Sequence, residues 1–373
     1  MNELTNLRAE AARVGAELSP LIEGLGEDEA LKLSVKSLGE AGITAWAVPA
    51  AFGGAETELV GPETVSVRAL CAAREELAYC NGVVDLAFIM QGLGSFTIAL
   101  SGNETLGRDF LPSVASGEKI AAFAVTEQGA GSSLGEVQTT ATRDGDDWLL
   151  TGVKTFISNA GVADRYSVLA RTGEDETTMF SVAAEDVRVE RFEVMAPHPI
   201  GEVHLEGARV PDAARLGEEG SGLKLALSTL QRFRTSVAAA ACGFAQRALD
   251  ESVSHLSTRE QFGRPLSKFQ GLRFDVAEMD ARLRAAQLLV EEAASVLDEG
   301  DDATSEVARA KLIATETAGW ICDRAVQLHG GLGVKKGSVV ERLYREERAL
   351  RIYEGTSEIQ KLILAKEIFD QES

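Results

Sequence analysis

The chain has 373 residues, 45% of them apolar, and a formal net charge of −21. This composition is typical of a folded globular protein of two or three domains. The negative charge argues against nonspecific binding to nucleic acid or to an anionic membrane, because both would repel the protein. The N-terminus lacks the apolar core of a secretory signal, and no stretch has the roughly 18 consecutive apolar residues of a spanning helix. We therefore expect a cytoplasmic protein that binds neither nucleic acid nor a membrane.

Residues 1–119 are predicted to form an N-terminal helical domain. Ala, Leu and Glu are abundant there, and apolar residues in the segment 64–79 recur every three or four positions, the period of an amphipathic helix. Two loops interrupt the pattern, at 48–54 and at 101–103. A new helix is expected to begin at the second loop.

Residues 120–219 are predicted to form a middle antiparallel β domain. Val, Thr, Phe and Trp occur in short runs, and turn signals separate these runs at 129–133, 144–147, 158–161 and 172–173. The run after Asp144-Gly145 has the pattern of the second arm of a hairpin.

Residues 220–373 are predicted to form a C-terminal helical bundle. Between 269 and 297 the apolar residues alternate at spacings of three and four, as in antiparallel bundles, and the pattern ends at Gly300. A second long helix is expected from about 305 to 329, and a last one after Gly355.

The cysteines and histidines show no metal-ligand spacing. The cysteines are far apart and form no CxxC pair: Cys71, Cys80, Cys242 and Cys322. The histidines are equally scattered: His198, His204, His255 and His329. The sequence predicts buried free thiols in a reducing compartment and no bound metal.

Two segments of the middle domain could contact a flat ligand. Residues 123–133 run from a strand into a loop of glycines and hydroxyl residues, where a ligand could approach the backbone. Residues 154–159 place Phe156 beside Ser158 at a strand end. Taken alone, each pattern is more often a glycine turn or the end of a core strand.

Three segments of the helical region could bind an anion or supply a base. Arg259 stands before a helix and could pair with a phosphate in a bidentate manner, and residues 327–333 place glycines at a helix end. Glu354 precedes Gly355 and Thr356, which are expected to cap the last helix. A helix N-terminus normally lowers the pKa of a carboxylate, whereas burial against a flat apolar surface would raise the pKa of Glu354 toward that of a useful base. Taken alone, these residues are also compatible with solvated charges and a capping glutamate.

Read in order, these segments resemble the acyl-CoA dehydrogenase family. Five motifs in the correct order and spacing carry the resemblance over nearly the full length: Thr126-Glu127 with Ala130-Gly131-Ser132, the strand from Trp148 to Asn159, Arg259 with Phe262-Gly263, Gln327 with Gly330-Gly331, and Tyr353-Glu354-Gly355-Thr356 with Gln360. The resemblance implies an α+β multidomain fold: an N-terminal helical domain (1–119), a middle antiparallel β domain (120–219) and a C-terminal four-helix bundle (220–373). It also implies a homodimer or homotetramer with FAD as the cofactor.

The resemblance assigns roles to individual residues. Those expected to contact FAD are Phe123, Val125, Thr126, Ser132, Phe156, Ile157, Ser158, Arg259, Phe262, Gln270, Gln327, Gly330, Gly331, Thr356 and Glu358. Those expected at the thioester are Ser132, Gln231, Arg234 and Gly355. Glu354 matches the catalytic base. Some family members carry the base just before the arginine that matches Arg234, but here that position is Phe233, which cannot take a proton.

The implied activity is α,β-dehydrogenation of an acyl thioester. Glu354 would remove the α-proton while the β-hydrogen leaves as hydride to flavin N5, and the product would be a trans-2-enoyl thioester. Hydrogen bonds from the backbone N–H of the base and from a flavin ribityl hydroxyl would stabilise the developing enolate. The electrons would pass to an electron-transfer flavoprotein.

Several positions depart from the family pattern. Gln128, Ser133 and Phe156 replace the more common Pro, Asp and Trp, and Gln231 replaces an Asp that helps to bind the carrier arm. The change at Gln231 leaves an acyl carrier protein open as the carrier in place of CoA. A flavin-dependent monooxygenase or oxidase on the same fold is the alternative function, and an assembly protein without flavin is a non-enzymatic one. Glu354 argues against the monooxygenase.

The motifs leave the acyl chain unspecified. Candidates for lining its pocket lie in the early helices: Phe88, Met90, Leu93 and Phe96. A core helix would carry the same residues, so both interpretations stay open.

Overall fold

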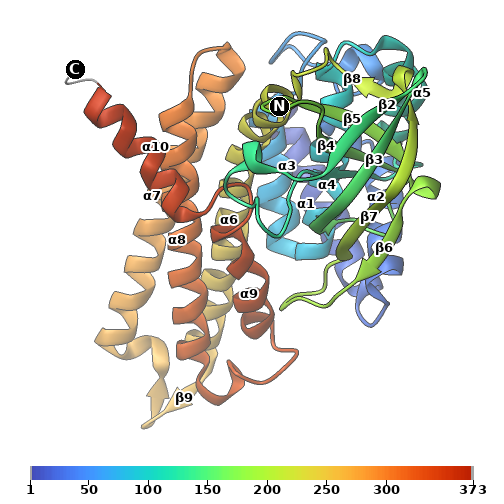
Figure 1. Ribbon diagram of the computed structural model, residues 1–373. Coiled ribbons are helices and arrows are strands. Elements are labelled where there is room, and N and C mark those ends of the chain that lie inside the picture. The colour runs from blue at the N-terminus through green and yellow to red at the C-terminus, as the bar shows by residue number, and fades with distance from the viewer. Residues whose placement is uncertain (1, 371–373) are drawn as a thin grey trace. The chain divides into compact units, whose positions relative to one another are not determined.

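The computed structural model describes residues 2–370 (Figure 1). Their contacts form two compact units, one made of residues 2–70 with 83–233 and the other of residues 71–82 with 234–370. The helices α3 (Val67–Cys80) and α6 (Gly222–Thr258) contribute to both units. The domain boundaries expected at 119/120 and 219/220 remain predictions.

The first unit begins with helices, as the composition predicts. They are α1 (Glu3–Ile22), α2 (Glu27–Glu40), α4 (Gly82–Leu100) and α5 (Glu104–Ala115). The 3₁₀ turn η1 (Thr44–Ala47) precedes the expected loop at 48–54, and a second turn, η2 (Ala50–Phe52), lies within it. The side chain of Asn103 accepts a hydrogen bond of 3.1 Å from the N–H of Leu106 and so caps α5. This cap confirms the helix start expected at 101–103.

Helix α4 is the core helix of this unit. It alone, within residues 2–370, is long and apolar enough to cross a membrane, and 83% of that segment is buried inside the protein. Gln91 Nε2 donates to the carbonyl of Lys119 (2.6 Å), and Thr97 Oγ1 donates to Ser167 Oγ in the sheet (2.8 Å). These bonds fix α4 against the sheet, as in a core helix. The pocket candidates on α4 are all buried: Phe88, Met90, Leu93 and Phe96.

The sheet of the first unit has the order β6-β7-β3-β2-β4-β5-β8, and β1 pairs with β4. Its strands are β1 (Ala121–Ala124), β2 (Thr140–Asp144), β3 (Asp147–Ser158), β4 (Arg165–Arg171), β5 (Thr177–Ala183), β6 (Arg188–Arg191), β7 (Ile200–Pro211) and β8 (Arg215–Leu216). Asp144 pairs with Asp147, which confirms the hairpin. The sheet is antiparallel except that β4 runs parallel to β1 and, at Thr140–Arg171, to β2. Turn signals in a sequence indicate hairpins between consecutive antiparallel strands. Parallel strands are joined by long crossover connections that carry no such signal, so the sequence did not predict this pairing.

The second unit is helical and confirms the C-terminal bundle. Besides part of α6 it contains α7 (Gln270–Glu299), α8 (Thr304–His329), α9 (Val339–Glu347) and α10 (Ser357–Asp370), with a small hairpin of β9 (Glu260–Gln261) and β10 (Arg264–Pro265). Helix α8 packs against α7, α9 and α10. The apolar seam of α7 is buried from Met279 to Leu297, and Gly300, with φ +88°, ends the helix as expected. The four cysteines are buried and form no disulfide with one another, as predicted.

Candidate active site

The two flavin-candidate segments of the β domain lie side by side. The N–H of Thr155 donates to the carbonyl of Thr126 (2.9 Å), and Lys154 Nζ donates to Glu127 Oε1 (2.7 Å). The side chains of this ion pair are 0% and 8% exposed. The same Glu127 oxygen also accepts from the N–H and hydroxyl of Thr139, at 3.0 and 2.6 Å. A buried, fully hydrogen-bonded carboxylate therefore joins the segment 123–133 to the segment 154–159.

Burial and charge shift the pKa values of Glu127 and Lys154 in opposite directions. Desolvation would raise the pKa of Glu127, but the charge and hydrogen bond of Lys154, with the bonds from Thr139, outweigh it and lower the pKa. Desolvation lowers the pKa of Lys154 to about 8, although Glu127 opposes the shift. Both groups are therefore charged at neutral pH, and each needs the other because an unpaired charge is costly to bury.

Phe156 is presented to solvent at an irregularity of β3. The pairing of β3 with β7 shifts register between Lys154 and Ile157, and Phe156 has a left-handed φ of +55°. Its side chain is 61% exposed, and its ring packs edge-on against Phe192 with the ring centroids 5.1 Å apart. Such a bulge re-aims a side chain out of the ladder, and here it exposes an aromatic ring that a flat cofactor could contact.

Ser158, two residues after Phe156, forms a polar pair with His198. Ser158 Oγ and His198 Nε2 share a hydrogen bond of 2.8 Å. Burial, together with the charge of Arg191, lowers the pKa of His198 to about 4. The imidazole is therefore neutral at physiological pH and holds the serine hydroxyl in place.

The remaining FAD candidates of this unit differ in exposure. The side chains of Phe123, Val125 and Ile157 are buried, so a contact with FAD would be made by their main chain. Ser132 is exposed in a loop where a side chain built on Gly131 would meet nothing within 4 Å. The exposed ring, the Ser158 hydroxyl two residues away and the open glycine loop have the chemistry that the edge of an isoalloxazine would need.

In the second unit, Glu354 lies in a loop with two consecutive left-handed residues. The loop joins η8 (Arg348–Arg351) to α10, and φ is +53° at Glu354 and +92° at Gly355. The φ of Gly355 is one that L side chains rarely adopt, and a Cβ there would also displace Gln360 Nε2, 2.6 Å away, so glycine is favoured at this position. A non-glycine residue in this conformation costs about 1–3 kcal/mol and persists only where the surroundings impose it.

The main chain of this loop is held by side-chain donors that are buried or half-buried. Arg234 Nε donates to the carbonyl of Glu354 (2.7 Å), and Gln360 Nε2 donates to the carbonyl of Gly355 (2.9 Å). Lys311 Nζ donates to three carbonyls of the loop and of the turn before it, and one of these is again Gly355 O (2.6 Å). These contacts impose the left-handed conformation and place Arg234 next to the predicted base.

The start of α10 has the cap that the sequence predicts. Thr356 Oγ1 accepts from the N–H of Ile359 (3.3 Å), and Ser357 Oγ donates to Glu316 Oε1 (2.5 Å). Glu358 is exposed in the first turn. Its pKa is lowered by hydrogen bonds from its own N–H and from Thr356.

The segments that match the phosphate and adenosine contacts of FAD meet at one end of α6 and α8. His255 in α6 and His329 in α8 stack with their ring centroids 4.4 Å apart. The N–H of Arg259 donates to the carbonyl of His255 (2.8 Å), so Arg259 lies beyond that stack. The other members of this group are also exposed: Phe262, Gln270, Gln327, Gly330 and Gly331. Phe262, at the tip of the β9–β10 hairpin, has a φ of +53° and is 92% exposed.

Gln231 and Phe233 lie on α6 in the first unit. Phe233 is fully buried and packs edge-on against Phe96, with the ring centroids 5.4 Å apart. This packing supports the inference that the alternative base position is an apolar core position. Gln231 is partly buried.

Lys311 and His198 lie outside the sequence motifs, and Lys154 lies in the motif strand but received no role from it. A lysine inside a helix normally has its ammonium group in water, and only its place in the buried stripe with Ala308, Ala314 and Thr315 marks Lys311 as unusual. Lys154 and His198 carry no such signal, because their partners are distant in sequence.

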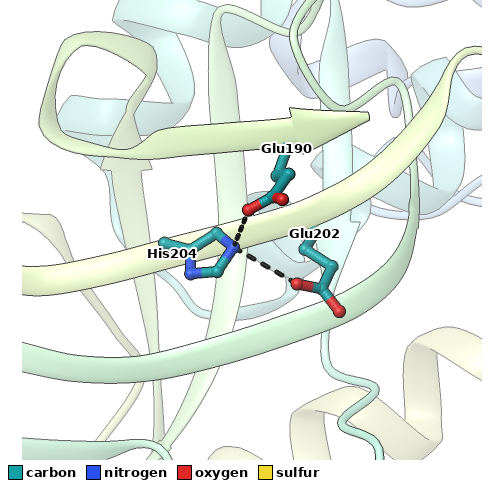
Figure 2. A group of neighbouring side chains, drawn as sticks. All are labelled: Glu190, Glu202 and His204. Atoms are coloured by element: carbon teal, nitrogen blue, oxygen red, sulfur yellow. Dashed lines mark ion pairs between the residues drawn. The ribbon is translucent and has the colours of Figure 1, made fainter. Parts of the chain in front are cut away.

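Glu190, Glu202 and His204 form a cluster on strands β6 and β7 (Figure 2). His204 Nε2 lies 3.5 Å from a Glu190 oxygen and 3.3 Å from a Glu202 oxygen. The carboxylate side chains are 65% and 39% exposed, and Arg188 donates to Glu190 (3.4 Å). A guanidinium so close opposes a bound cation, and the cluster is explained as a surface ion-pair network.

An open pocket of about 600 Å³ lies at the edge of the β domain. Its lining includes Asn103, Arg165 and Arg215. It contains none of the residues predicted for FAD or thioester binding, and it is therefore separate from the candidate site.

Comparison with known proteins identifies the family. The models of the acyl-CoA dehydrogenase N-terminal, middle and C-terminal domains match residues 2–118, 122–208 and 220–369. The chain is 36% identical to the 3-(aryl)acrylate reductase of Clostridium sporogenes, over 94% of both chains. It is 38% identical to the caffeyl-CoA reductase-Etf complex subunit CarC of Acetobacterium woodii, over 78% of this chain and 79% of the relative.

A solved structure agrees with these relatives. The butyryl-CoA dehydrogenase of Megasphaera elsdenii is 30% identical, with a TM-score of 0.88 over 99% of both chains. All three parts of the chain, helical, β and helical, thus have counterparts in one family. Members of this family use FAD. The chain therefore belongs to the acyl-CoA dehydrogenase family of FAD-dependent oxidoreductases.

Proposed function

We propose that this protein dehydrogenates an acyl thioester at its α,β-bond to the trans-2-enoyl thioester, with Glu354 as the base. The observation that carries the proposal is the left-handed loop, in which Arg234, Lys311 and Gln360 hold the main chain around Glu354. A strained residue that is held by several buried donors is typical of a functional position. Bound FAD supplies the hydride acceptor at N5.

The residues of the chain have distinct tasks in this proposal. Glu354 takes the α-proton, and its main-chain N–H is assigned to the thioester carbonyl, where negative charge develops. Phe156 and Ser158 are assigned to the isoalloxazine, and Arg259 to the phosphates. The neutral His198 supports the assignment of Ser158 to the isoalloxazine, because it fixes the hydroxyl of Ser158 without adding a charge.

The carrier group and the acyl chain of the substrate are separate proposals. CoA is favoured by the names of the relatives, which include a caffeyl-CoA reductase. An acyl carrier protein stays open because Gln231 replaces the usual acidic residue. The aryl substrates in the relatives' names support a test of aromatic acyl groups beside straight and branched chains.

Reduction of an enoyl thioester is the second candidate function. Two relatives that share 36% and 38% identity with the chain are named as reductases. Proton transfer at Cα is reversible, so a protonated Glu354 would return the proton in the reductive direction. The redox partner then sets the direction, and the same residues serve both.

We propose an electron-transfer flavoprotein as the partner, self-association into a dimer or tetramer, and a cytoplasmic location. The name of the CarC relative includes Etf, which supports the first assignment. Exposed apolar side chains of the helical unit support the second: Phe262, Phe274, Leu362 and Phe369. Such residues are frequent at protein interfaces.

The test is anaerobic titration of the purified holoenzyme with CoA thioesters and acyl-phosphopantetheine mimics. We expect one class of thioester to bleach the flavin. Glu354→Gln should keep FAD but lose about 10²- to 10⁴-fold in reduction rate. Glu292→Gln, at an exposed position of α7, is the control. A yellow protein that no thioester bleaches, but that accepts electrons from NAD(P)H, would overturn the proposal in favour of a monooxygenase.

A further inference from the structure

The ammonium group of Lys311 is buried inside the helical unit. Lys311 lies on α8 and is 1% exposed. Its Nζ donates to the carbonyls of Leu350 (3.1 Å), Tyr353 (2.8 Å) and Gly355 (2.6 Å). An ammonium group has three N–H donors. All three are used by the main chain around Glu354, so none remains for a substrate.

One of these carbonyls belongs to a peptide that also carries the N–H of Glu354. The Tyr353 carbonyl and the Glu354 N–H are the two ends of one planar amide. A positive charge on the carbonyl end draws electron density from the nitrogen and makes the N–H a stronger donor. Lys311 therefore acts on the peptide group next to the predicted base without touching the reacting atoms.

We propose that Lys311 is a positioning residue that fixes the Glu354 loop and polarises the Tyr353–Glu354 peptide, so that its N–H binds the thioester carbonyl more strongly. This inference rests on the proposed function, because it needs a thioester carbonyl at that N–H. It goes beyond the assignment of Glu354, since it explains why a lysine is buried behind the loop. A neutral side chain of the same length would fill the space but would not polarise the peptide.

The charge of Lys311 has a limited pH range. Desolvation lowers its pKa to about 8, while Glu354 opposes the shift and Arg234 adds to it. These two are the charged groups that act on Lys311 from the loop and from α6. The polarising effect should therefore be nearly complete well below pH 8, fall to half at about pH 8 and disappear above it.

The test uses the holoenzyme and a thioester labelled with ¹³C at its carbonyl. Isotope-edited infrared spectroscopy gives the carbonyl stretch of the bound thioester, which falls as the hydrogen bond to it strengthens. We expect Lys311→Met to keep its FAD and to unfold cooperatively on heating. In this variant the carbonyl stretch should move toward its value in solution, and anaerobic flavin reduction should slow by about 10- to 100-fold. Lys361→Met, at an exposed lysine of α10, should change neither quantity.

Two outcomes separate this inference from the proposed function. A wild-type protein that no thioester bleaches refutes the proposed function. A wild-type protein that is bleached, with an unchanged carbonyl stretch and rate in Lys311→Met, refutes the role of Lys311 alone. If Lys311→Met does not fold, the wild type decides: the stretch should shift toward its solution value between pH 7 and 9.5, and a constant stretch contradicts the inference.

Discussion

The two units hold unfavourable backbone conformations by different means. Within residues 2–370, the non-glycine residues with positive φ are Phe156, Asn159, Phe262 and Glu354. All four lie in motifs that the sequence singled out. At Phe156 the conformation comes from a register shift in a β ladder, so neutral main-chain hydrogen bonds enforce it. At Glu354 it comes from a buried lysine, a half-buried arginine and an amide side chain.

This difference indicates which substitutions should disturb each region. The β ladder around Phe156 depends on strand pairing, which depends in turn on the buried Glu127–Lys154 pair beneath it. The loop of Glu354 depends directly on charge and on a glycine. We therefore expect damage to the first region to appear as lost stability, and damage to the second to appear as lost rate.

The largest effect on stability is expected for Lys154→Met. It leaves the carboxylate of Glu127 buried without its cation, which costs about 3–5 kcal/mol in the free energy of unfolding. Denaturant unfolding measures this cost. The control is Lys119→Met, whose ion pair with Asp164 is partly exposed and contributes no more than about 1 kcal/mol. Equal losses in the two variants would show that the buried pair is not what stabilises this region.

A large effect on rate, with a smaller effect on stability, is expected for Gly355→Ala. The added Cβ would lie 2.6 Å from Gln360 Nε2, so this amide must leave the Gly355 carbonyl, and with a strained φ of +92° we expect the loop to shift at Glu354. A displacement of this kind costs about 100-fold in flavin reduction by a thioester. Gly42→Ala is the matched control, because Gly42 has a φ of +72° but open space around it. If both variants reduce at the wild-type rate, the loop does not need its observed conformation.

The smallest effect is a loss of stability in acid. The pKa of Glu127 is lower in the folded state than its ordinary value of 4.5, so its contribution is complete above that value. It is lost as the pH falls through the folded pKa, because the unfolded chain then binds the proton more readily. Unfolding between pH 6 and 3 should show this slope, and Glu127→Gln should flatten it. An unchanged slope in that variant would assign the acid sensitivity to other carboxylates.

Local signals made part of this molecule predictable. Asn103 caps α5 and Gly300 ends α7, where a short-range rule decides the outcome. The parallel pairing of β1 with β4 and the bulge at Phe156 depend on strands that are distant in sequence, so no local pattern encodes them. Helix α9, rich in arginine and glutamate, was not predicted as a separate helix.

The residues of the candidate site were also predictable only in part. The motifs located Glu354 and Gly355 because their residue types are specific. They did not locate Lys311, since a lysine in a helix is normally solvated and only the fold shows that its ammonium group meets three carbonyls. Residues that act on a loop from another element require the tertiary structure to be found.

The measurement that tests the central claim most directly is α-proton exchange in D₂O. A CoA thioester that cannot be oxidised is incubated with the holoenzyme, and deuterium at Cα is followed by NMR or mass spectrometry. The account predicts exchange with the wild type and with Glu292→Gln, and exchange slower by about 10²- to 10⁴-fold with Glu354→Gln. Exchange at the wild-type rate in Glu354→Gln would contradict the assignment of Glu354 as the base.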